Sequence, residues 1–124
     1  MTNDFESIQS IADAAIGAIG DELTFAFSRV LEVIALCTTN EIAVLGVEIF
    51  EVRSGGYSTV NLSTYEQQMG SDPKQRSDWA DYVKANNVLA DEFIRSNPTG
   101  DEHVYLLTTA SWGEFCKIQE VRGQ

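Results

Sequence analysis

Apolar residues recur at helical spacing in the first third of the chain. Over residues 4–19 they stand every three or four positions, as one face of an amphipathic helix requires, and Asn3 or Asp4 can cap the start of that helix. The same spacing returns over residues 24–38. Asn40 is expected to end this second helix, because asparagine tolerates the left-handed conformation that often follows a helix. The pattern therefore predicts helices over 4–19 and 24–38.

The pattern changes at Ile42. Residues 42–47 form a continuous apolar run rich in β-branched side chains, which is typical of a strand covered on both faces. The strand continues to Val52, residues 53–56 supply a turn that contains two glycines, and residues 57–62 return as a second strand. We therefore predict a β-hairpin over about residues 42–62.

The second half of the chain predicts a third helix and a third strand. Ser77 can cap a helical repeat, and Asn97-Pro98-Thr99-Gly100 ends it. The inner face of this helix carries four large side chains that we expect to be buried against the hairpin: Trp79, Tyr82, Leu89 and Phe93. Residues 103–109 are predicted as the third strand. Residues 112–121 fit either a short helix or a further strand.

The order of these elements predicts an α+β fold. We expect a small, mostly antiparallel sheet with a central hairpin at about 42–62 and about three helices packed on it. The chain has 124 residues and shows no repeat, linker or low-complexity tract, so residues 1–124 are predicted to form a single globular domain. Hydrophobic residues make up 44% of it, which is enough for a core without disulfide or metal staples.

Charge is the unusual property of the composition. The chain has 19 acidic and 8 basic residues, so its net charge at pH 7 is −11. Such a surface repels phosphate backbones and anionic lipids, which argues against nucleic acid and membrane surfaces as partners. A basic protein is the partner that this charge suits.

The sequence also favours a cytoplasmic location. The N-terminus is acidic where a signal peptide would be basic, and no apolar run approaches the roughly 20 residues that span a bilayer. Cys37 and Cys116 are far apart and lie among apolar neighbours, so we expect free, buried thiols.

Catalytic motifs are missing from the sequence, and we expect no cofactor and no metal site. There is no nucleophile elbow, phosphate-binding loop or zinc motif. The single histidine, His103, follows Asp101 and Glu102; it either begins a surface strand or acts as an acid/base group. Adjacent acidic pairs are expected to be solvated surface rather than catalytic carboxylates. These pairs are Asp21-Glu22, Asp91-Glu92 and Asp101-Glu102.

Two acidic residues interrupt the long apolar strand. Glu48 and Glu51 either mark a half-exposed face of the hairpin or form a row of carboxylates that a rigid sheet presents to a partner. Tyr57, on the returning strand, is of the residue type that often anchors interfaces. Glu48, Glu51 and Tyr57 are therefore our candidate partner-binding residues.

Residues 31–50 carry a resemblance to a known family. A helix leads through a short break into Ile42-Ala43-Val44-Leu45-Gly46, followed by the acidic Glu48 and the aromatic Phe50. This segment resembles a family of small immunity proteins from bacterial polymorphic-toxin systems, in which it reads more like Gly-Ile-Ala-Val-Leu-Gly-Gly-Asp-Val-Tyr. Here Asn40-Glu41 stands near the first glycine, and Val47 stands where the family has a second one in succession.

The resemblance implies a cytoplasmic antidote that binds one cognate toxin domain, normally encoded beside it, and blocks that toxin. It implies no catalytic residue, and only Glu48 matches a family position of interest. The alternative is a small α+β ligand-binding domain or enzyme with a pocket between helices and sheet, in which His103 with Glu102 or Glu48 would be the reactive pair. A third interpretation is a subunit of a larger assembly that uses the hairpin as its interface.

Overall fold

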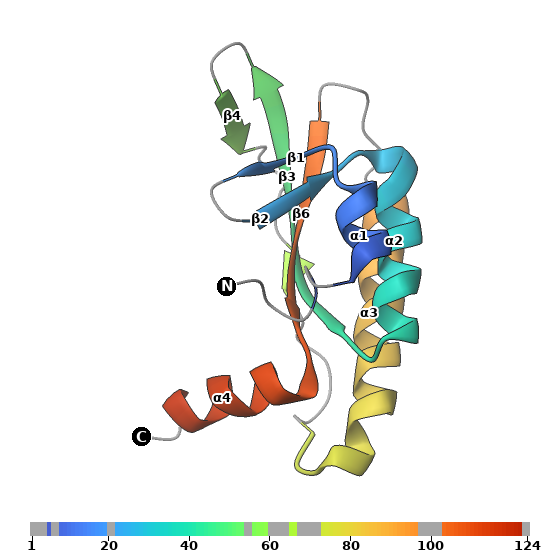
Figure 1. The fold of residues 1–124 in the computed structure, drawn as a ribbon, viewed down its shortest axis with the longest axis vertical. Helices are drawn as coiled ribbons and strands as arrows, with labels where there is room; N and C mark the ends of the chain where they lie inside the picture. Colours follow the sequence, from blue (N-terminus) through green and yellow to red (C-terminus); the bar gives the residue numbers. More distant parts are fainter. Residues whose placement is uncertain are drawn as a thin grey trace.

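The computed structural model describes the backbone of residues 5, 8–19, 22–53, 56–59, 65–66, 73–96 and 103–122, and the side chains of these apart from residues 53–66 and 118–122. The fold is α+β, as predicted. Three helices lie together on one side of an antiparallel sheet, and a fourth lies near one end of it (Figure 1). The helices are α1 (Gln9–Ala14), α2 (Phe27–Thr39), α3 (Trp79–Ser96) and α4 (Trp112–Arg122). None of the described helices is both long and apolar enough to cross a membrane.

All strand pairings in the described sheet are antiparallel. Along the sheet the order is β1-β2-β6-β3-β4, and β5 pairs with part of β3. The strands are β1 (Gly17–Ile19), β2 (Glu22–Phe25), β3 (Ala43–Arg53), β4 (Gly56–Thr59), β5 (Tyr65–Glu66) and β6 (His103–Ala110). The predicted hairpin is confirmed in β3 and β4, where Phe50 pairs with Thr59 and Arg53 with Gly56.

The N-terminal quarter differs from the prediction of one long helix. Helix α1 covers only six residues, and residues 17–19 form β1, which pairs with β2. Residues 24 and 25, predicted as helix, belong to β2 and pair with Leu106 and Tyr105 of β6. Glycine has a poor helix propensity, and Gly17 interrupts the helical segment. The pairing of β2 with β6, which lies about 80 residues later in the chain, then overrides the helical spacing of apolar residues at positions 24 and 25.

Residues 112–121, which the apolar pattern left undecided, are helical in α4. A reciprocal capping box begins this helix: the backbone N–H of Ser111 donates to Oε1 of Glu114 at 2.9 Å, and the backbone N–H of Glu114 donates to Oγ of Ser111 at 3.3 Å. Ser111-Trp-Gly-Glu114 is the sequence signature of that motif, so the helix could have been chosen from the sequence.

The described core consists of two groups of buried side chains. The larger lies between the three helices and the sheet and includes Phe25, Val33, Ile49 and Tyr105. The smaller surrounds Trp79, which is fully buried and packs its ring against those of Tyr82, Trp112 and Phe115. Of the four large residues expected to be buried on the third helix, Trp79 alone is fully enclosed. Tyr82, Leu89 and Phe93 are half-buried.

A tight junction joins α2 to β3. The backbone N–H of Ile42 donates to the carbonyl of Cys37 and that of Glu41 to Thr38, which is the double hydrogen bond of a Schellman helix end. Glu41 takes the left-handed conformation, with φ of 56°. Asn40, which we expected there, has φ of −97°. A non-glycine residue with this φ is under strain, and contacts from α3 hold it in place.

Two side chains from the first half of helix α3, Trp79 and Asn87, hydrogen-bond to this junction. Nε1 of Trp79 donates to the carbonyl of Glu41 at 2.7 Å. The buried amide of Asn87 accepts from the backbone N–H of Val44 at 2.8 Å and donates to the carbonyl of Ile42 and to Oγ1 of Thr38, both at 3.0 Å. Asn87 therefore connects α3 to the end of α2 and to the start of β3.

The two cysteines differ in their surroundings, and we expect them to differ in reactivity. Cys37 is fully buried, and this burial raises the pKa of its thiol to about 12, whereas Cys116 is half-buried. At pH 8 an alkylating reagent should modify Cys116 first and Cys37 only on unfolding, because the thiolate is the reactive form. Mass spectrometry of native and unfolded protein checks this, and fast native labelling of Cys37 would contradict it.

The same shift predicts the direction of a pH effect on stability. The thiol of Cys37 keeps its proton in the folded state to a higher pH than in the unfolded chain, where its pKa is ~8.5. The protonated thiol of Cys37 therefore contributes fully to the free energy of unfolding below ~pH 8.5, and this contribution is lost as the pH rises toward 12. A Cys37→Ala variant should lose that part of the alkaline destabilisation.

Candidate functional site

The strand acids Glu48 and Glu51 do not form a row, so one of the two interpretations offered for them, a shared surface of carboxylates, is wrong. In β3, Glu48 pairs with Leu106 of β6 and Glu51 pairs with His103, in a register that is regular from Gly46 onward. Successive strand residues point to opposite faces, so a separation of three places the two carboxylates on opposite sides of the sheet. Each is half-buried.

Glu51 lies on the side of the sheet that the helices cover. Ile49, two residues before it, belongs to the core beneath α2 and α3. Glu48 lies on the other side, across from Leu106, which is 3% exposed and next to the buried Thr24 of β2. Tyr57 pairs through its backbone with Val52, and its side chain lies outside the described residues.

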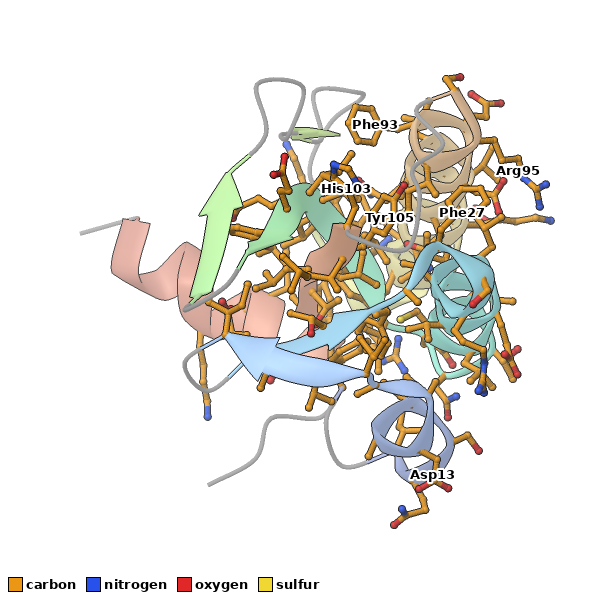
Figure 2. The ribbon with its side chains drawn as sticks, turned by 90° about the horizontal axis from the view of Figure 1, so that it is seen from above. Asp13, Phe27, Phe93, Arg95, His103 and Tyr105 are labelled. Carbon is orange, nitrogen blue, oxygen red and sulfur yellow. The ribbon has the colours of Figure 1, made fainter. Side chains whose placement is uncertain are left out.

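The single histidine, His103, does not lie beside Glu48, one of the two carboxylates expected to form a reactive pair with it. His103 lies on the helix-covered side of β6 with Tyr105, whose ring centroid is 6.1 Å from that of Phe27 (Figure 2). Glu48 lies on the other side of the sheet, so the pair of His103 and Glu48 proposed for an enzyme is wrong. Glu102 lies outside the described residues. Nδ1 of His103 is buried and has no hydrogen-bond partner among the described residues.

The layer between helices and sheet is occupied by core side chains. Val30 and Val33 of α2, Ile94 of α3 and Tyr105 of β6 are each 0% exposed. These residues fill the place where the alternative interpretation expects a ligand pocket. A pocket in this layer would have to be lined by other residues.

A groove of about 290 Å³ lies instead between α2 and α3. Its lining residues are Ile34, Ala35 and Thr38 of α2 and Asn87, Val88, Asp91 and Glu92 of α3. Ile34 and Asn87 are buried and form its floor, whereas Ala35, Thr38, Val88 and Glu92 are exposed, so the groove opens to solvent. Val88 is 50% exposed, and among the described residues it shares such exposure of a large apolar side chain with Ile16 and Val52.

Two of the residues that line the groove, Asp91 and Glu92, carry carboxylates. Asp91 is half-buried and binds the exposed Arg95 one helical turn away, with Nε and Oδ1 2.5 Å apart. Glu92 is exposed. On the neighbouring turn of α2, Glu32 binds Arg29 at 2.7 Å. The groove therefore combines apolar side chains on both helices with carboxylates along its α3 side.

Sequence reasoning assigned Asp91 and Glu92 to a solvated helix face and missed the groove. The available signal was the pair of apolar residues, Ala35 and Val88, that interrupt the polar faces of two helices. That signal is weak, because nothing in the sequence shows that the two faces adjoin.

Among the described residues, no three histidine, cysteine, aspartate or glutamate side chains converge as metal ligands would. No protein-family model matches this sequence, and no curated protein shows significant similarity to it.

Proposed function

We propose that this chain is a cytoplasmic immunity protein that binds and neutralises a cognate bacterial toxin domain with a basic surface. The observation that carries the proposal is the net charge of −11 on a chain of 124 residues. Among the residues that the structure describes, Arg29, Arg76 and Arg95 already lie within 2.9 Å of a carboxylate. The resemblance of residues 31–50 to immunity proteins supports the same proposal.

A field of this sign would act mainly on the rate of binding. Surfaces of opposite charge accelerate protein encounter by about 10–10³-fold, and salt removes that acceleration. At ~0.15 M salt the Debye length is about 8 Å, so the carboxylates nearest the contact contribute most. Glu48 and Glu51 belong to a paired strand, so docking against either costs little conformational entropy. Because these two carboxylates lie on opposite faces of the sheet, one partner surface meets only one of them, and we propose Glu51, on the face that carries α2 and α3. Glu48 and Tyr57 remain candidates only for a partner that docks on another surface.

Single substitutions can show which face of the sheet contacts the partner. Glu51 lies on the side that carries α2 and α3, whose exposed acids include Glu32, Asp81 and Glu92. We therefore expect Glu51→Gln to slow association about twofold, the effect of losing ~0.4 kcal/mol of charge attraction, and to weaken its salt dependence. Glu48→Gln is the matched control, and it should leave the association rate and its salt dependence near the values of the unsubstituted chain. Stopped-flow kinetics with the cognate toxin domain, which the proposed function expects to be encoded beside this gene, measure the rates. The reverse order would place the partner on the opposite face.

The function itself is tested by protection. The toxin domain encoded beside this gene is produced in a bacterial host, with and without this chain, and growth is recorded. We expect the chain to restore growth and to copurify with the toxin domain. Continued growth arrest, with no complex formed, would contradict the proposal.

The same assay addresses the alternative, a small ligand-binding domain or enzyme that uses His103. Nδ1 of His103 is buried without a partner among the described residues, which keeps that residue of interest. A binding protein should protect equally well after His103→Ala. A folded His103→Ala variant that no longer protects would favour the enzyme.

A further inference from the structure

The groove between α2 and α3 is lined by both apolar and acidic side chains. Apolar side chains lie on both helices, Ile34 and Ala35 on α2 and Val88 on α3, and the α3 side also carries the carboxylates of Asp91 and Glu92. We infer that this groove receives a lysine or arginine side chain from a basic partner protein. The inference rests on the proposed function and adds the surface by which the partner is held.

The apolar part fits the stem of such a side chain. Lysine and arginine have long methylene stems that cover apolar surface while the charged end stays near water or a carboxylate. Val88 is 50% exposed and Ala35 lies across the groove, so both lose water when a stem lies between them. Val88 and Glu92 are one helical turn apart on the same face, so a stem over Val88 brings its cation to Glu92.

The carboxylates fit the charged end. Glu92 is exposed, and Asp91 is bound through Oδ1 to Arg95; a carboxylate has two oxygens and about four lone-pair sites, so it can accept from a second donor as well. A charge-assisted hydrogen bond in a partly dry groove is stronger than one in open solvent. The charge also selects the occupant, since a second copy of this chain would bring a further net charge of −11.

The groove is also preorganised. Asn87 on its floor donates to Oγ1 of Thr38 at 3.0 Å, and that hydroxyl donates to the carbonyl of Ile34 at 3.1 Å. The first bond joins α3 to α2, and the second holds the Thr38 hydroxyl against its own helix. A partner side chain therefore binds between walls that are already ordered, which lowers the entropy lost on binding.

The test compares two substitutions that add the same charge at different places. Ala35→Arg puts an arginine of this chain into the groove and should occupy it. Ala80→Arg is the matched control, because Ala80 is also exposed on a helix but lies eight residues from Val88, roughly 12 Å along α3. The net charge changes equally in both variants, so any loss of steering is the same. Circular dichroism and thermal melting establish that each variant is folded.

Dissociation of the toxin domain encoded beside this gene is measured by surface plasmon resonance. We expect Ala35→Arg to dissociate at least ~10-fold faster than the unsubstituted chain, and Ala80→Arg to remain within about twofold. Glu92→Gln, which keeps the groove open, should also dissociate faster. If the unsubstituted chain binds and both groove variants dissociate at its rate, the groove inference is wrong and the proposed function stands.

Two other outcomes are distinguishable from that one. If the unsubstituted chain does not bind the toxin domain at all, the proposed function fails, and this inference fails with it. If sedimentation shows that the free chain is a dimer and that Ala35→Arg separates it, the groove holds a second copy, which contradicts a basic partner as the occupant.

Discussion

Replacing Trp79 with alanine is expected to lower the free energy of unfolding by about 3–5 kcal/mol, as for other large buried side chains. Trp79 is 0% exposed, and its ring centroid lies 5.2–5.5 Å from those of Tyr82, Trp112 and Phe115. The substitution leaves a cavity where α3, α4 and the start of β3 meet. It also removes the hydrogen bond to Glu41, whose left-handed conformation depends on such contacts. Urea denaturation measures the loss.

Trp79→Phe separates packing from hydrogen bonding. It keeps an aromatic ring and removes the Nε1–H donor, so we expect a loss of about 1–2 kcal/mol. A loss for Trp79→Ala below ~1 kcal/mol, the range of surface substitutions, would show that Trp79 is not part of the core.

The second large effect is expected at Asn87. Replacing it with leucine, which has a similar shape, leaves the buried backbone N–H of Val44 and the carbonyl of Ile42 without the partner that Asn87 supplies. Each unsatisfied buried group costs about 1–3 kcal/mol, so we expect a loss of about 3 kcal/mol. The midpoint of urea unfolding should fall accordingly, with little change in its slope.

The neighbouring Asn86 provides the matched control. It is also buried, but its amide donates only to the carbonyl of Tyr82 in its own helix, and its oxygen has no partner among the described residues. Asn86→Leu should therefore cost less than ~1 kcal/mol, since it removes one local bond and one unsatisfied oxygen. Equal losses at both positions would mean that the bonds of Asn87 to β3 do not stabilise the fold.

The sequence predicted those elements whose signals are local. The hairpin of β3 and β4 follows from an apolar run and a glycine-containing turn, and α3 from an uninterrupted helical repeat. The first helix was predicted too long because Ile16 and Ile19 stand at helical spacing from Ile11 and Ala12. Their place in and beside β1 depends on pairing with β2, which itself pairs with β6. No local pattern contains that information.

The candidate site was less predictable than the fold, for two different reasons. That Glu48 and Glu51 lie on opposite faces follows from the alternation of strand residues and could have been derived from their separation. The groove requires Ala35 and Val88, 53 positions apart in the sequence, to lie on adjacent helices. That adjacency depends on buried contacts such as the hydrogen bond between Asn87 and Thr38.

Glu41 at the α2–β3 junction adopts φ of 56°, a conformation that glycine reaches without strain. This junction follows Thr38, which lines one end of the groove.

The salt dependence of binding tests the central claim most directly, namely that this acidic chain captures a basic toxin domain. Association with the toxin domain encoded beside this gene is followed by stopped flow at ~0.1 M and ~1 M salt, between which the Debye length falls from about 10 Å to about 3 Å. We predict a complex whose association rate falls at least ~10-fold over this range, while dissociation changes far less. A rate that does not change with salt, or that increases with it, would contradict capture by charge.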